Sequence, residues 1–166
     1  MDLLALITQT PLLNIVLHQP EIPGNTGAVG RTCVALGAKL WLVRPLGFRV
    51  DEKTLRRAGL DYWQHLDWEV ADHWDDLVFR LKPKRIWYFS RFAQRSYTSI
   101  EYQVGDTFVF GSETVGLPSS LTWEVPEQLL RVPTTDKVRS LNLATTVGIA
   151  AFEAARQLGF SGVQAE

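Results

Sequence analysis

The chain has 166 residues, of which 46% are hydrophobic and 21% are charged. These proportions exclude intrinsic disorder, which needs low hydrophobicity and high net charge, and the length fits one globular domain. A formal net charge of −1 excludes a uniformly basic surface, although a local basic patch that binds RNA remains compatible with it.

The predicted elements alternate between strands and helices. The apolar run LLNIVL at residues 12–17 is typical of a strand that is buried on both faces of a parallel sheet. After a loop rich in proline and glycine, Asn25 or Thr26 is expected to cap the first helix, and Gly37 is expected to end it. Further strands are expected over residues 39–43, 85–89, 107–110 and 129–132, and further helices over 52–57 (capped by Asp51), 72–81 and 142–158 (followed by Gly159). The alternation predicts an α/β fold with a mostly parallel sheet flanked by helices.

The ends of the chain and its cysteine content bear on where the protein works. A lone cysteine, Cys33, cannot form an internal disulfide, so we expect a reducing, cytoplasmic compartment. Asp2 stands where a signal peptide carries positive charge, and no apolar stretch has the length of a membrane span.

The three histidines lack metal-ligand spacing, so we expect no metal. We expect an N-terminal extension over residues 1–11, a single domain over 12–160 and a C-terminal tail over 161–166.

The segment NTGAVGR, from Asn25 to Arg31, lies at the first strand-to-helix junction. Free main-chain N–H groups and the helix dipole favour an anion at such a junction, and Arg31 could clamp a phosphate. The alternative is that the glycines allow close packing and that Arg31 is a solvated charge. The G-x-G start of a dinucleotide fingerprint is absent.

Two further segments adjoin predicted elements where α/β proteins bind ligands. In GSETVGLP, residues 111–118, Gly111 would let a ligand approach the backbone, and Glu113 is the only carboxylate. The alternative is an ordinary turn with a solvated glutamate. Ser140 and Asn142 precede the long final helix, where capping and ligand contact are compatible uses of the same helix end.

A fourth segment, KTLRRAGLDYW at residues 53–63, combines a basic cluster with aromatic residues. This combination suits RNA, because cations bind phosphates and rings stack on bases. The alternative is a solvated helix face that runs into a packed core.

Taken together, these segments resemble the SPOUT methyltransferases, and most of all the tRNA (cytidine/uridine-34) 2′-O-methyltransferases, which modify the wobble nucleotide. The resemblance runs from about residue 13 to residue 160, and LRRAGLDYW favours this branch over other ribose methyltransferases. Its marks are LNIVLHQPEIPGNTGAVGRTC from residue 13, RPLGF at 44–48, LRRAGLDYW at 55–63, GSETVGLP at 111–118 and RSLNLATTVGIAAFEAARQLG at 139–159.

The resemblance implies an α/β fold with a deep C-terminal trefoil knot that holds S-adenosylmethionine, and a homodimer that binds the anticodon stem-loop of tRNA. The residues that it and the motifs above implicate fall into three groups. The catalytic candidates are Asn25, Arg31, Glu113, Ser140 and Asn142; the cofactor-binding candidates are Phe89, Gly111, Val132, Ser140, Leu141 and Leu143; the RNA-binding candidates are Lys53, Arg56, Arg57, Tyr62 and Arg139.

The implied reaction is attack by a ribose 2′-hydroxyl on the sulfonium methyl group. A guanidinium stays protonated in proteins, so Arg31 is expected to act electrostatically, lowering the hydroxyl pKa and fixing a phosphate near the cofactor of the other subunit. Three alternatives stay open: a SPOUT methyltransferase for another tRNA or rRNA position, a non-catalytic RNA- or nucleotide-binding module, and a small-molecule enzyme on a doubly wound sheet.

Overall fold

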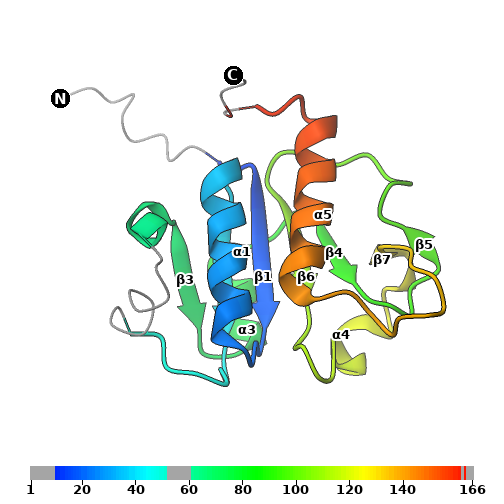
Figure 1. Cartoon of the computed structure of the whole chain (residues 1–166), viewed down its shortest axis with the longest axis horizontal. Helices are drawn as coiled ribbons and strands as arrows, with labels where there is room; N and C mark the ends of the chain where they lie inside the picture. The colour runs from blue at the N-terminus through cyan, green and yellow to red at the C-terminus, as the bar shows by residue number, and fades with distance from the viewer. Residues whose placement is uncertain (1–9, 52–60, 162, 164–166) are drawn as a thin grey trace.

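The computed structural model describes residues 10–51, 61–161 and 163. Its strands form one sheet in the order β3-β2-β1-β6-β4-β7-β5, and neighbouring strands pair in parallel throughout (Figure 1). This confirms the predicted α/β fold with helices flanking the sheet. The strands are β1 Leu13–His18, β2 Lys39–Val43, β3 Trp68–Ala71, β4 Ile86–Phe89, β5 Arg95–Ser96, β6 Asp106–Phe110 and β7 Leu129–Arg131. The helices are α1 Pro23–Leu36, α3 Trp74–Leu81, α4 Ser119–Thr122 and α5 Leu143–Gln157, with 3₁₀ turns η2 Asp61–His65 and η3 Pro126–Gln128.

The central strands have a core on each face. Alternate residues of β1 point to opposite faces, so Ile15 packs with α1 and α5, whereas Val16 packs with α3 and α4. All six residues of β1 are buried, as the continuous apolar run predicts. Because all neighbouring strands pair in parallel, their carboxyl ends lie along one edge of the sheet.

Two parts of the sequence prediction need correction, and one lies outside the described residues. The helix α1 begins at Pro23, not after Asn25 or Thr26, and its N-cap is Ile22, which makes no side-chain cap hydrogen bond. Proline at the first helical position has the dihedral angle that a helix needs, which explains the earlier start. Strands β3 and β5 were not predicted, because β3 is half-buried and β5 has only two residues. The predicted helix over 52–57 lies outside the described residues.

Other predicted helix ends are confirmed. The N-cap of α5 is Asn142, whose side chain accepts a hydrogen bond from the N–H of Thr145. Gly37 ends α1 in the left-handed conformation, with a φ of 67°, and Gly159 has the same φ after α5. These signals are local, so a reading of neighbouring residues is sufficient to find them.

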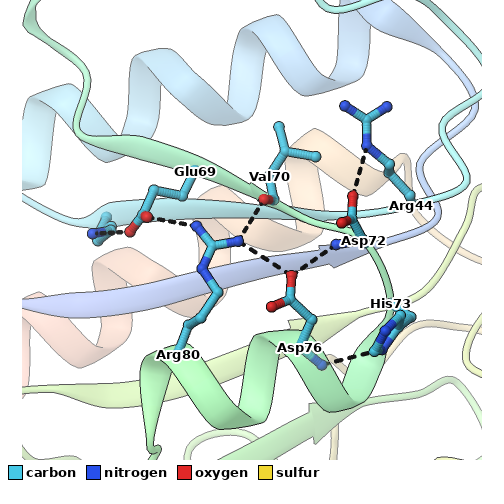
Figure 2. Close-up of polar contacts among 8 residues, drawn as sticks. Arg44, Glu69, Val70, Asp72, His73, Asp76 and Arg80 are labelled. Carbon is cyan, nitrogen blue, oxygen red and sulfur yellow. Dashed lines mark hydrogen bonds and ion pairs between the residues drawn. The ribbon is translucent and has the colours of Figure 1, made fainter.

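A network of charged residues covers the outer edge of the sheet at β3 (Figure 2). Arg80 of α3 donates one hydrogen bond to the carbonyl oxygen of Val70 (2.8 Å) and others to Glu69 (2.6 Å) and Asp76 (3.2 Å). The carbonyl of Val70 belongs to the edge strand, so Arg80 occupies an acceptor that another strand could otherwise use. The guanidinium also lies over the ring of the buried Trp41, 5.1 Å from its centroid.

Candidate functional site

The carboxyl ends of β4, β6 and β7 lie side by side and form the floor of the candidate site. Phe89 of β4 is in register with Phe110 of β6 and with Leu130 of β7. Gly111 and Val132 come directly after these strands. The segment after β7 then leads to the N-terminus of α5, at the same end of the sheet (Figure 1). Three predicted cofactor residues, Phe89, Gly111 and Val132, therefore stand on adjacent strand ends.

A chain of hydrogen bonds joins three of the predicted catalytic residues. The carboxylate of Glu113 accepts hydrogen bonds from the main-chain N–H groups of Glu21 (2.8 Å) and Ile22 (3.1 Å) and from the side-chain amide of Asn25 (3.3 Å). The side-chain oxygen of Asn25 accepts a hydrogen bond from the amide of Asn142 (2.9 Å). We call Asn25, Glu113 and Asn142 the amide–carboxylate cluster. It ties together the start of α1, the loop after β6 and the start of α5.

The charge of Glu113 fixes the orientation of both asparagine side chains. An ionised carboxylate only accepts hydrogen bonds, so Asn25 must turn its NH₂ group toward Glu113 and its oxygen toward Asn142. Asn142 must then donate with its NH₂ group, which leaves its oxygen to accept the N–H of Thr145. One negative charge thus sets the donor and acceptor positions from α1 to α5.

The predicted anion site at the start of α1 is occupied by the protein itself. Glu113 provides the negative charge that the N-terminus of a helix favours, and it accepts the N–H groups of Glu21 and Ile22, the two residues before the helix. Glu113 is therefore not the solvated glutamate of an ordinary turn. Sequence reasoning could not find this role, because the partners lie about ninety residues away in the chain.

Gly111 is needed for a close approach, but the approaching group belongs to this chain. A Cβ atom at Gly111 would lie 2.0 Å from the main-chain carbon of Gly116 and 2.2 Å from the nitrogen of Leu117. The loop folds back on itself through a bridge between Ser112 and Gly116. This close contact requires a glycine at position 111, and the prediction that a ligand also approaches the backbone here stays a prediction.

Arg31 does not join the amide–carboxylate cluster. It is exposed on α1, and its guanidinium carbon lies 5.6 Å from the centroid of the Tyr62 ring. Arg31 comes six positions after Asn25, which is about 9 Å along a helix axis. The hydroxyl of Tyr62 donates a hydrogen bond to the carbonyl oxygen of Gly27 (2.6 Å), and burial raises the pKa of this tyrosine.

The aromatic end of the LRRAGLDYW segment packs against α1. A Cβ atom at Gly30 would lie 2.7 Å from the ring of Trp63, so this glycine allows the close packing that was one of the two interpretations of its motif. For Trp63 the packed-core alternative therefore holds. The basic candidates Lys53, Arg56 and Arg57 lie outside the described residues.

The remaining candidates lie on the segment from β7 to α5. Arg139 and Ser140 are exposed, whereas Val132, Leu141 and Leu143 are half-buried. Among the described residues, the one hydrogen bond within residues 132–141 joins the N–H of Lys137 to the hydroxyl of Thr135 (3.4 Å). Most main-chain groups of this segment are thus open to a ligand, which suits a cofactor that is bound by backbone N–H and C=O groups.

A pocket of about 360 Å³ adjoins the amide–carboxylate cluster, and sequence reasoning gave it no role. Its walls come from the ends of β1 and β2 and from the loop after β6. The RPLGF segment contributes one wall, although the sequence indicated only that it was a family mark. The lining residues are His18, Gln19, Glu21, Pro45, Leu46, Gly47, Ser112, Val115, Gly116 and Pro118.

The described part of the chain has neither a metal-binding cluster nor a membrane-spanning helix. Within residues 10–51, 61–161 and 163, no group of three or more His, Cys, Asp or Glu side chains is arranged to hold a metal ion. In the same part of the chain, no helix has both the length and the apolar character to cross a bilayer.

Known proteins similar to this chain share both its sequence and its fold. The SpoU rRNA Methylase family matches residues 12–152. The tRNA (cytidine(34)-2′-O)-methyltransferase of Burkholderia cenocepacia is 45% identical over 154 residues, which cover 91% of this chain and 99% of that protein. A structure solved for insight into the 2-OH methylation of C/U34 on tRNA is 43% identical, with a TM-score of 0.82 over 90% of this chain and 98% of that chain.

A more distant structure extends the comparison to a cofactor-bound protein. An rRNA methyltransferase from Sinorhizobium meliloti with bound AdoMet is 28% identical, with a TM-score of 0.77, and the match covers 90% of this chain and 58% of that one. The family match spans most of the chain, and the relatives at more than 40% identity match over almost their whole length. The chain belongs to the SpoU rRNA methylase family.

Proposed function

We propose that this protein transfers a methyl group from S-adenosylmethionine to the ribose 2′-hydroxyl of the wobble nucleotide of tRNA, cytidine or modified uridine at position 34. The observation that carries the proposal is the amide–carboxylate cluster at the carboxyl edge of the sheet, in a chain that is 45% identical to a tRNA (cytidine(34)-2′-O)-methyltransferase. Methyl transfer to a different tRNA or rRNA position is the second candidate, favoured by the rRNA methyltransferase among the similar structures.

S-adenosylmethionine fits the segment between β7 and α5. Leu141 and Leu143, which are half-buried, offer apolar surface for an adenine ring, and Phe89, Gly111, Val132 and Ser140 offer main-chain groups for its edges. The cofactor carries the reactive methyl group, so the task of the protein is to position the hydroxyl and to handle its proton.

Within the proposed site, the amide–carboxylate cluster orients the ribose. Asn25 and Asn142 present fixed donors and acceptors because Glu113 holds their amides in one orientation. Ser140 lies two residues before this cap and completes the catalytic set. Arg139, together with Lys53, Arg56, Arg57 and Tyr62, is proposed to bind the anticodon stem-loop.

Arg31 acts on the hydroxyl of the substrate from the other subunit of a homodimer. A protonated guanidinium stabilises the developing negative charge on the ribose oxygen and binds a neighbouring phosphate in a planar, bidentate manner. Its distance along α1 from the cluster of its own subunit supports this arrangement in trans. Light scattering at micromolar concentration should give the mass of a dimer, and a monomer would contradict the assignment.

The proposal also covers the form and location of the enzyme. Residues 12–160 make up one methyltransferase domain, with 1–11 as an extension and 161–166 as a tail, and the enzyme works in the cytoplasm. The chain between β7 and α5 passes through the loops of the sheet to form a trefoil knot. Support for the knot comes from the position of β7 between β4 and β5 and from the packing of α5 on α1.

The test is methyl transfer from labelled S-adenosylmethionine to unmodified and native tRNA pools, with nucleoside mapping of the product. We expect label on a 2′-O-methyl nucleoside at position 34, and its loss in the Arg31→Ala variant. Label at another position of tRNA, or on rRNA only, would favour the second candidate. Absence of cofactor binding would overturn both.

A further inference from the structure

The pocket next to the amide–carboxylate cluster combines apolar walls with an acidic group. Pro45, Leu46 and Val115 provide apolar surface, and His18 and Glu21 provide polar groups. Its volume of about 360 Å³ is in the range of small-molecule sites and is ample for one nucleobase. Proteins hold a base that has left its stack between aromatic or apolar side chains, with hydrogen bonds to the edge of the base.

The charge of the pocket determines which ligands it can accept. The hydroxyl of Thr114 donates a hydrogen bond to the carboxylate of Glu21, and this bond lowers the pKa of Glu21, so the group is ionised at neutral pH. Burial lowers the pKa of His18, so its imidazole is neutral. A negative group beside a neutral one repels a phosphate or a carboxylate, and it favours a neutral ligand that carries N–H donors.

Glu21 connects the pocket to the candidate catalytic centre. Its main-chain N–H donates to Glu113, while its side chain lies against the loop that forms one wall of the pocket. The side of the pocket that Pro45, Leu46 and Gly47 form is joined to the chain just before Glu21, because the N–H of Gly47 donates to the carbonyl oxygen of Pro20 (2.9 Å). A base in this pocket would therefore place its own ribose next to the amide–carboxylate cluster.

We propose that this pocket binds the base of the wobble nucleotide and that Glu21 is a specificity-determining residue, which accepts a hydrogen bond from the exocyclic amino group of cytosine. The inference rests on the proposed function. A carboxylate accepts from the cytosine N4 amino group, whereas uracil has at the same place a carbonyl oxygen that offers no hydrogen, so cytidine is the preferred of the two proposed substrates. The carboxylate also accepts hydrogen bonds from the hydroxyl of Ser112 and the main-chain N–H of Thr114, and of its about four lone-pair sites one is left for a ligand.

The main test compares two tRNA transcripts that differ only at nucleotide 34, cytidine or uridine. We expect the Glu21→Gln variant to lower the ratio of kcat/KM for the C34 transcript to that for the U34 transcript by about tenfold. Glutamine keeps the size of the side chain and an oxygen for Thr114, and its NH₂ group can donate to uracil. A general loss of folding would reduce both rates together and leave the ratio unchanged.

Glu101→Gln is the matched control, because Glu101 is exposed at the opposite end of β6 from the pocket. It makes the same change of charge, and we expect the wild-type ratio. An unchanged ratio in Glu21→Gln would overturn the role of Glu21.

A second measurement does not depend on catalysis. Cytidine and uridine are titrated into the protein while the methyl resonances of Leu46 and Val115 are followed by NMR. We expect cytidine to shift them at lower concentration than uridine, and Glu21→Gln to remove that difference. This result without any methylation of tRNA would sink the proposed function but support the pocket, whereas equal or absent shifts with methylation intact would do the reverse.

Discussion

Two polar networks in this molecule are built from similar bonds but have different consequences. The amide–carboxylate cluster joins residues that are far apart in the chain, from α1, the loop after β6 and α5, through one carboxylate and two amides. The network around Arg80 joins residues of β3 and α3, which are neighbours in sequence, through opposite charges. The first fixes the relative positions of three elements, whereas the second covers the side of an edge strand.

The difference teaches how a polar network can be assigned to function or to stability. In the amide–carboxylate cluster each amide has one permitted orientation, so a change at one residue alters what its neighbours donate and accept. In the Arg80 network, each partner is partly exposed to solvent, which can replace a lost ion pair at small cost. Four predictions test this contrast.

Glu113→Gln should have the largest effect. The NH₂ group of glutamine cannot accept from the main-chain N–H of Glu21 or Ile22 or from the side-chain amide of Asn25, so at least one of these donors loses its partner. We expect methyl transfer to fall about 100-fold, as misplacement of a positioned reactant does, and the free energy of unfolding to fall by about 1–3 kcal/mol. Single-turnover kinetics and urea unfolding measure the two effects. Wild-type activity would remove the cluster from the mechanism.

Asn142→Asp should separate activity from stability. Aspartate caps a helix as well as asparagine does, so the free energy of unfolding should stay close to that of the wild type. Aspartate cannot donate to the side-chain oxygen of Asn25, however. The NH₂ group of Asn25 faces Glu113, so in its present geometry it cannot also donate to a carboxylate at position 142. We expect at least a tenfold loss of kcat/KM. Asn142→Ala is the comparison, because it should lose about 1 kcal/mol of stability as well.

Arg80→Met should affect stability alone. The methionine retains apolar contact with Trp41 but removes the hydrogen bonds to Glu69, Val70 and Asp76. We expect a slightly lower Tm and unchanged methyl transfer, measured with the same tRNA substrate as for Glu113→Gln. A loss of activity comparable to that of Asn142→Asp would mean that the two networks are coupled.

The smallest expected effect is the pH dependence of that stability difference. Burial raises the pKa of Glu69, but hydrogen bonds from Lys39 and Arg80 outweigh this effect and lower the pKa below 4.5. The pKa of Asp76 is lowered below 3.8, first by a hydrogen bond from the main-chain N–H of Asp72 and then by the contact with Arg80. A lowered pKa stabilises the fold above the ordinary value, and this contribution is lost as the pH falls through the lowered one. The difference in stability between wild type and Arg80→Met should therefore narrow as the pH falls below about 4.5, as thermal unfolding between pH 3 and 7 can measure. A constant difference would contradict the ionic origin.

The sequence predicted what depends on neighbouring residues and missed what depends on distant ones. The buried strand β1 and the cap at Asn142 follow from local patterns of apolar and polar residues. The resemblance to a family singled out Asn25, Glu113 and Asn142, but the hydrogen bonds between them depend on contacts across 88 to 117 positions, which no local pattern contains. The pocket beside Glu21 could not be predicted for the same reason, because its walls come from the ends of β1, β2 and β6, which are far apart in the sequence.

The order of the strands also bears on how the chain folds during its synthesis. Strand β1 pairs on one side with β2, which follows directly, but on the other side with β6, which begins only at Asp106. The unit of β1, β2 and β3 can therefore form early, while the other edge of β1 stays open until the ribosome has released most of the chain. Parallel pairing between distant segments is slow to form, so this open, apolar edge is where a nascent chain would aggregate or bind a chaperone.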